Sequence, residues 1–96
     1  MDGLEVGFAK ADITPRDKPL TLYHRRGRRS DVTAVRDSLH ARATAFKGED
    51  GVFALVTLDT LCADGRLRAA ISPTLRKCGI PPEHVALCAT HTHTGP

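Results

Sequence analysis

The sequence has little material for a large hydrophobic core. Among its 96 residues there are no tryptophan, one tyrosine and three phenylalanine residues. The hydrophobic fraction of 41% is ordinary for a soluble protein. A chain of this length forms at most one small domain and buries about 60–65% of its unfolded surface. We therefore expect a single domain with a thin core.

Signals for export and for membrane insertion are also missing. The start, M-D-G-L-E-V-G, has neither a basic n-region nor an apolar h-region, and no later apolar run is long enough to span a bilayer. As it stands, the sequence predicts a cytoplasmic protein, unless a further segment precedes it.

The cysteine pattern also argues against a disulfide framework. The three cysteines, Cys62, Cys78 and Cys88, are odd in number and do not have the spacing of a small disulfide scaffold. Reduced thiols are the simpler interpretation. Because Cys62 and Cys88 lie on or next to apolar runs, we expect these two to act as small hydrophobic residues.

Positive charge is concentrated in one segment, although the net charge is only +3. Residues 16–33 show little periodicity, surround Gly27 and are predicted to form a loop. This loop has three interpretations: a solvated surface, a contact for an acidic partner such as an anionic membrane surface, or the mouth of an active site. Only Tyr23 could support base stacking, so nucleic acid is not expected. The cations that would meet a membrane are Arg25, Arg26, Arg28 and Arg29.

Hydrophobic patterning predicts four strands and one helix. Residues 4–11 alternate loosely and end at Asp12 and Thr14, which can bond nearby amides before Pro15. Residues 40–47 and 52–58 flank the turn Gly48-Glu49-Asp50-Gly51 and predict a hairpin. The second of these strands is apolar on both faces, which is typical of the middle of a covered sheet. A last strand is expected to begin at Val85 and to end in the histidine pair His91 and His93.

The helix is predicted between about residues 64 and 77. Leu67, Ile71, Leu75 and Cys78 form its apolar stripe, whereas Arg66, Arg68, Arg76 and Lys77 are expected to face solvent. Ser72-Pro73 predicts a kink or two short helices, and Gly79 predicts the end. Strand, helix and strand then form a crossover unit with parallel strands. The fold class is therefore α/β: a small mixed sheet with a β-hairpin followed by a β-α-β crossover, an incomplete portion of a larger domain.

Chemistry concentrates at residues 85–96, V-A-L-C-A-T-H-T-H-T-G-P. Alternate residues of a strand share a face, so His91 and His93 are expected to project to the same side, where two imidazoles can bind one zinc or another divalent cation. The alternative without a metal is that the histidines only make hydrogen bonds within the domain or lie at the surface. The motif His-x-His-x-Asp-His is excluded, because Gly95 and Pro96 occupy its last two positions. His24, His40 and His84 are expected at the surface or in loops.

Asp59 follows the strand 52–58 and should share the carboxyl edge of the sheet with the histidine pair. It is a candidate for orienting a metal-bound imidazole, for binding the metal directly, or for capping the segment that follows. Because a zinc site normally takes three protein ligands, we expect the sequence to be a fragment of a longer chain.

These landmarks resemble the N-terminal part of the catalytic domain of the neutral/alkaline, non-lysosomal ceramidase family. The segments that carry the resemblance are V-G-F-A-K-A-D-I-T-P, R-D-S-L-H-A-R-A-T-A-F and A-T-H-T-H-T-G-P. It spans residues 1–96, and the family usually has serine where Thr94 stands.

The resemblance implies a zinc-dependent hydrolase that cleaves the N-acyl amide of ceramide into sphingosine and a fatty acid. It implies that His91 ligates Zn²⁺ and that His93 assists at the same site. Family members are often secreted. Remaining ligands are expected beyond Pro96, so the fragment should be inactive alone.

Two other function classes stay open at this point. The first is a different metal-dependent hydrolase of amides or esters, including an amidohydrolase barrel that opens with His-x-His. The second is a non-catalytic basic module that binds lipid.

Overall fold

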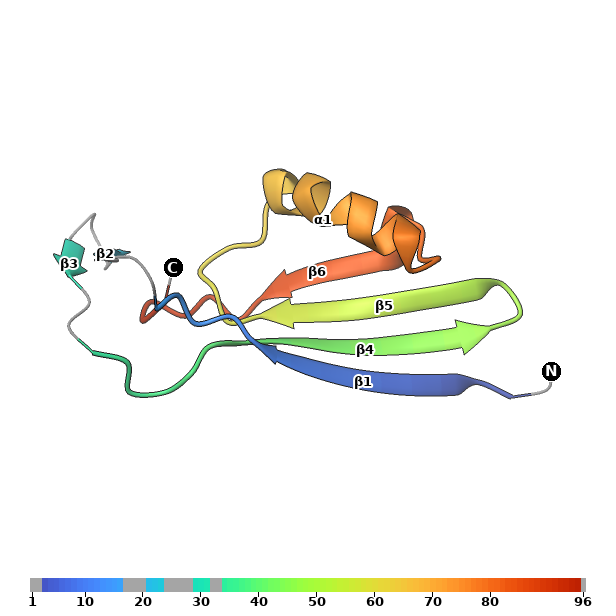
Figure 1. Ribbon diagram of the computed structural model, residues 1–96, viewed down its shortest axis with the longest axis horizontal. Helices are drawn as coiled ribbons and strands as arrows, with labels where there is room; N and C mark the ends of the chain where they lie inside the picture. The colour runs from blue at the N-terminus through green and yellow to red at the C-terminus, as the bar shows by residue number, and fades with distance from the viewer. Residues whose placement is uncertain (1–2, 17–20, 24–28, 32–33, 96) are drawn as a thin grey trace.

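The computed structural model describes residues 3–16, 21–23, 29–31 and 34–95. Its main body is a four-stranded mixed sheet with one helix (Figure 1). The strands are β1 (Glu5–Asp12), β4 (His40–Gly48), β5 (Gly51–Leu58) and β6 (Val85–Ala89), in the spatial order β1-β4-β5-β6. The helix α1 (Gly65–Lys77) and the 3₁₀ turn η2 (Pro82–His84) connect β5 to β6. The predicted α/β class, with a hairpin followed by a β-α-β crossover, is confirmed.

The register of the sheet sets its two faces. β1 and β4 pair antiparallel, β4 and β5 form the predicted hairpin, and β5 and β6 are parallel. The hairpin turns at Gly51, whose φ of 110° lies in a region that glycine tolerates and bulkier residues rarely adopt. Pairing of Leu58 with Ala89 aligns the carboxyl ends of the two parallel strands. Asp59 and the histidine motif therefore leave the sheet at the same edge, as predicted.

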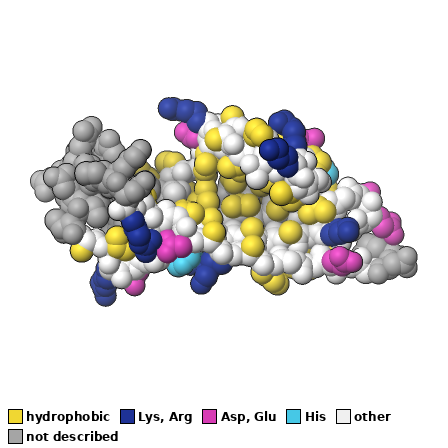
Figure 2. Space-filling view, in the orientation of Figure 1, with side chains coloured by type: hydrophobic (Ala, Val, Ile, Leu, Met, Phe, Trp, Pro, Cys, Tyr) yellow, Lys and Arg dark blue, Asp and Glu magenta, His cyan; other side chains and the backbone are white. Residues whose placement is uncertain are grey.

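The helix covers one face of the sheet incompletely. On β6 the residues Val85, Leu87 and Ala89 are buried or half-buried, whereas Ala86 and Cys88 are exposed. Val85 is the sole buried hydrophobic residue of the described part, at 4% exposure. Figure 2 shows hydrophobic side chains gathered between α1 and the strands beside it. The expected thin core is confirmed.

The opposite face of the sheet remains apolar and exposed. Cross-strand pairing places Val6, Phe46 and Phe53 in one row and Phe8 and Leu55 in the next. Phe8 is 80% exposed, and the others are 37–45% exposed. β5 is an inner strand as predicted, but the expectation of a sheet covered on both faces is wrong for the described residues, because the helix lies on one side only.

The helix begins and ends with standard capping interactions. The Asp64 carboxylate accepts a hydrogen bond from Leu67 N–H at 3.0 Å. At the other end Gly79, with φ 77°, donates to Arg76 O and Ile80 N–H donates to Leu75 O. This pair of bonds is the Schellman arrangement, which ends a helix at a left-handed glycine.

Three helix predictions need correction. α1 is one continuous helix through Pro73, so the alternative of two short helices is wrong, and the Ser72 hydroxyl donates back to Arg68 O at 2.7 Å. Cys78 does not belong to a buried stripe, since all three cysteines, Cys62, Cys78 and Cys88, are exposed free thiols. Cys88 is exposed because the alternation of β6 places it on the uncovered face. Arg68 does not face solvent, as described next.

Arg68 fastens the helix to the sheet. One guanidinium nitrogen donates to Pro82 O and another to Val85 O, both at 2.7 Å. Bonds from a charged donor to two carbonyl groups are stronger than neutral ones and fix orientation. Arg68 therefore holds α1, η2 and the start of β6 together.

The basic segment is only partly described. Thr21–Tyr23 (β2) and Arg29–Asp31 (β3) form a short antiparallel ladder, so the prediction of a loop throughout residues 16–33 is wrong there. Arg25, Arg26, Arg28 and His24 lie outside the described residues, and for Arg29 the backbone alone is described. Membrane contact through these arginines stays a prediction. No helix in the described ranges has the length and apolarity of a membrane span.

We expect Arg68→Ala to lower the free energy of unfolding by about 2 kcal/mol, because two carbonyl groups lose a charged donor. Urea denaturation followed by circular dichroism measures the change. Arg66→Ala is the matched control on the same helix: its side chain is 97% exposed, so its removal should change stability little. Equal losses in the two variants would show that Arg68 is not a structural clamp.

Candidate metal centre at the carboxyl edge of the sheet

The histidine motif leaves β6 through a sharp change of backbone direction. β6 ends at Ala89, and His91 has φ 63°, in the left-handed region that non-glycine residues seldom adopt. We predicted that His91 and His93 share a face because they are alternate residues of a strand. That reason is wrong, since neither histidine belongs to β6. Both follow the strand, and a turn sets their side chains.

The turn still brings the two rings together. The centroids of the His91 and His93 rings are 5.0 Å apart, with an interplanar angle of 83°. Thr92 and Thr94 support the turn, because their hydroxyl oxygens lie 2.9 Å apart and Thr94 N–H donates to Thr92 Oγ1 at 3.2 Å. Both histidines are exposed, so a solvent cation can reach them.

Hydrogen bonds to the segment after β5 fix His91. Its backbone N–H donates to Thr60 O at 3.0 Å, and its ring Nδ1 lies 2.9 Å from Leu61 O. A carbonyl oxygen can only accept, so Nδ1 carries the proton and donates. The second ring nitrogen, Nε2, is then the one with a lone pair. This is the arrangement typical of a metal-binding histidine, whose other nitrogen donates to a carbonyl or carboxylate.

The ring separation also suits a shared zinc ion. Two imidazoles that bind zinc at about 2.0–2.1 Å in tetrahedral geometry have ring centroids about 5 Å apart. The observed separation of 5.0 Å agrees. Within the described residues, no group of three or more His, Cys, Asp or Glu side chains is arranged to hold a metal ion. Within the described residues, the candidate centre therefore consists of these two histidine rings alone.

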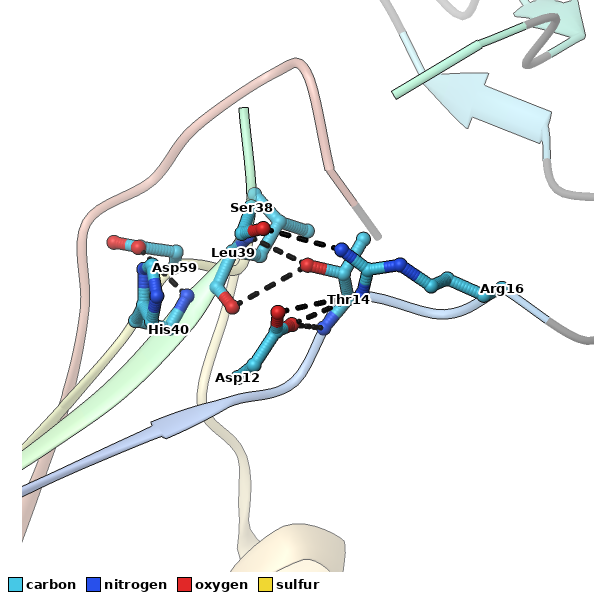
Figure 3. Close-up of polar contacts among 7 residues, drawn as sticks. All are labelled: Asp12, Thr14, Arg16, Ser38, Leu39, His40 and Asp59. Carbon is cyan, nitrogen blue, oxygen red and sulfur yellow. Dashed lines mark hydrogen bonds and ion pairs between the residues drawn. The ribbon is translucent and has the colours of Figure 1, made fainter. Parts of the chain in front are cut away.

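Asp59 lies beside the start of β4. Its Oδ2 accepts from His40 N–H at 2.9 Å and from the Arg42 guanidinium at 3.1 Å (Figure 3 shows the His40 contact). The backbone hydrogen bond from His40, then Arg42, lowers the pKa of Asp59 below its usual value. The carboxylate thus joins the end of β5 to β4. The group that orients the His91 imidazole is the Leu61 carbonyl and not Asp59.

A second polar cluster ties β1 to the same edge (Figure 3). Ile13 N–H donates to Leu39 O at 2.9 Å, and Leu39 N–H donates to Thr14 Oγ1 at 2.7 Å. Asp12 accepts from Thr14 N–H at 2.8 Å, as the sequence predicted, and pairs with Arg16 at 3.2 Å. The Thr14 hydroxyl and amide and the Arg16 guanidinium hold the pKa of Asp12 well below its usual range.

Gly95 packs the histidine turn against this edge. It is buried, and a Cβ atom at this position would lie 3.0 Å from Leu39 Cδ1 and 3.4 Å from Asp59 O. The close approach explains why the position carries glycine. It also places the end of the motif directly over the start of β4 and the exit of β5.

His84 was expected at the surface or in a loop. It lies in the 3₁₀ turn η2 of the connection to β6, where it is half-buried and stacks on Phe53, with ring centroids 4.0 Å apart. Its Nδ1 donates to Val52 O at 3.0 Å. His84 lies at the amino end of β6, away from the candidate centre at the other end. Sequence reasoning also missed Thr60 and Leu61, because their backbone carbonyls carry no sequence signal.

We expect Asp59→Asn to lower the free energy of unfolding by about 1 kcal/mol at pH 7, because charged hydrogen bonds become neutral ones. A carboxylate with a lowered folded-state pKa contributes stability above its unfolded pKa of about 3.9 and loses it as pH falls through the folded value. The difference from wild type should therefore shrink as the pH falls below about 4. Urea denaturation across this range tests it.

The control is Asp50→Asn, in the exposed β4–β5 turn, which removes a carboxylate without touching His40 or Arg42. If Asp59→Asn and Asp50→Asn follow the same pH dependence, the carboxylate of Asp59 does not join the strands electrostatically.

Comparison with known proteins identifies no family or function for this chain. The chain matches no model of a known protein family, and no curated protein matches it.

Proposed function

We propose that the chain contributes part of the metal centre of a zinc-dependent hydrolase, with His91 as a zinc ligand through Nε2 and His93 as its assisting neighbour. The observation that carries the proposal is the 2.9 Å bond from His91 Nδ1–H to Leu61 O, which leaves Nε2 as the nitrogen with the lone pair. The exposure of both rings and their 5.0 Å separation support it further.

Zinc, when bound, would polarise an acyl carbonyl and lower the pKa of a coordinated water to about 7. The residues of the chain prepare for this role in three ways. The Leu61 carbonyl fixes the ring orientation of His91, the turn at Thr92 and Thr94 holds His93 beside it, and Gly95 anchors the turn on the sheet. His93, at its position next to the metal ligand, can hold or transfer a proton at a reacting oxygen or nitrogen.

For the substrate we propose an N-acyl amide of the ceramide type, which water would split into sphingosine and a fatty acid. The support is the resemblance of A-T-H-T-H-T-G-P and the preceding segments to neutral ceramidases. An amide or ester of another kind is the alternative within the same chemistry. Because zinc enzymes normally use three protein ligands, hydrolysis requires ligands in addition to the described histidines.

Zinc affinity tests the metal assignment. The wild-type protein should bind one zinc ion per chain, and His91→Ala should weaken binding by at least about tenfold, since even indirect partners of metal ligands contribute about 10–100-fold. Competition with a chromogenic chelator measures the affinity. His84→Asn is the matched control, because it removes a histidine at the other end of β6. Equal zinc affinity in wild type and His91→Ala would refute the assignment.

Hydrolysis tests the substrate. The protein that carries this sequence should release labelled fatty acid from a ceramide, and both a zinc chelator and His91→Ala should abolish the release, because each removes the metal from the centre. His84→Asn should keep it. Release that persists in His91→Ala would place the catalytic metal elsewhere. Binding of zinc without release from ceramide, but with release from a short N-acyl amide or ester, would keep the hydrolase and reject the lipid substrate.

A further inference from the structure

The segment that follows β5 presents two successive backbone carbonyls to one residue. Thr60 O accepts from the backbone N–H of His91 at 3.0 Å, and Leu61 O accepts from its ring Nδ1–H at 2.9 Å. One bond fixes where the His91 backbone lies, and the other fixes where its ring points. The two together define the direction of Nε2.

A side chain holds this pair of carbonyls in place. The Thr60 hydroxyl donates to Cys62 O at 3.0 Å, two residues along the chain. Such a local side-chain bond closes the segment into a turn and restricts rotation of the peptide groups inside it. Leu61 lies between the two bonded residues, so the Thr60–Cys62 bond limits the directions that its carbonyl can take.

His91 needs this support because its own backbone is strained. Its φ of 63° places a non-glycine residue in the left-handed region, which costs roughly 1–2 kcal/mol. Strained residues of this kind persist where surrounding bonds over-determine them, and they cluster at functional sites. The bonds to Thr60 O and Leu61 O supply that constraint.

We propose that Thr60 is the positioning residue of the metal centre: its hydroxyl sets the Leu61 carbonyl, and through it the tautomer and direction of the His91 imidazole. The consequence for zinc rests on the proposed function, whereas the consequence for the tautomer does not. Thr60 touches neither metal nor substrate in this role.

The tautomer is measured in the metal-free protein by ¹⁵N nuclear magnetic resonance of the histidine rings, at a pH where they are neutral. Wild-type His91 should carry its proton on Nδ1. Thr60→Val, which keeps the shape of the side chain but removes the hydroxyl, should shift His91 toward the Nε2–H form that histidine prefers in water. Thr60→Ser should restore the Nδ1–H form. A general structural loss would not be repaired by serine alone.

Two results overturn the proposal. One is a wild-type His91 with its proton on Nε2, which decides the matter even if Thr60→Val does not fold. The other is a folded Thr60→Val protein with an unchanged tautomer.

Zinc affinity is the second readout. It should fall about tenfold in Thr60→Val, as is typical when a partner of a metal ligand is lost, and recover in Thr60→Ser. If the wild-type protein binds no zinc, the proposed function fails, and the tautomer measurement still decides the role of Thr60.

Discussion

The hydrogen bonding between β5 and β6 continues past the ends of both strands, and the candidate centre depends on this continuation. After the pairing of Leu58 with Ala89, Thr90 N–H donates to Leu58 O and His91 N–H donates to Thr60 O. The two exits therefore run together before they separate. Because the backbone of His91 is fixed by main-chain bonds to the neighbouring exit, its ring can be aimed by one further bond, to Leu61 O. A histidine on a free tail would lose much more conformational entropy on binding a metal ion.

Polar contacts at the same edge connect the ends of β1 and β5 to the start of β4. Asp59 joins the end of β5 to His40 at the start of β4, and Thr14 joins the end of β1 to Leu39. The opposite edge, with the β4–β5 turn, has polar contacts of its own: His84 Nδ1–H donates to Val52 O, and Arg68 donates to Pro82 O and Val85 O. Polar contacts therefore hold the chain at both ends of the sheet. The sheet itself contributes less, since the described part buries a single hydrophobic residue and exposes a row of large ones on the uncovered face.

This distribution accounts for the role of Arg68. A thin core leaves the helix with little apolar area to hold it, and packing alone stabilises such an element weakly. Two charged hydrogen bonds from Arg68 to Pro82 O and Val85 O supply orientation that the core does not. The helix in turn sets the path of the chain into β6, and so the position of the histidine motif at the far end of that strand.

The sequence by itself determined the four strands of the main sheet, the helix and their order. Local signals predicted the hairpin and the helix through short-range sterics and hydrogen bonds. These signals are the alternation in residues 4–11, the Gly48–Gly51 turn and the stop at Gly79. The histidine pair was likewise predicted from its residues. Only the tertiary structure decided how the pair is held. Backbone groups from distant segments meet at these positions, and backbone groups are the same at every position of a sequence. They bond His91 to the carbonyls of Thr60 and Leu61, and they bond the Arg68 guanidinium to the start of β6. The exposed face of the sheet also escaped prediction, because an apolar strand specifies what it could bury but not whether a partner layer lies against it.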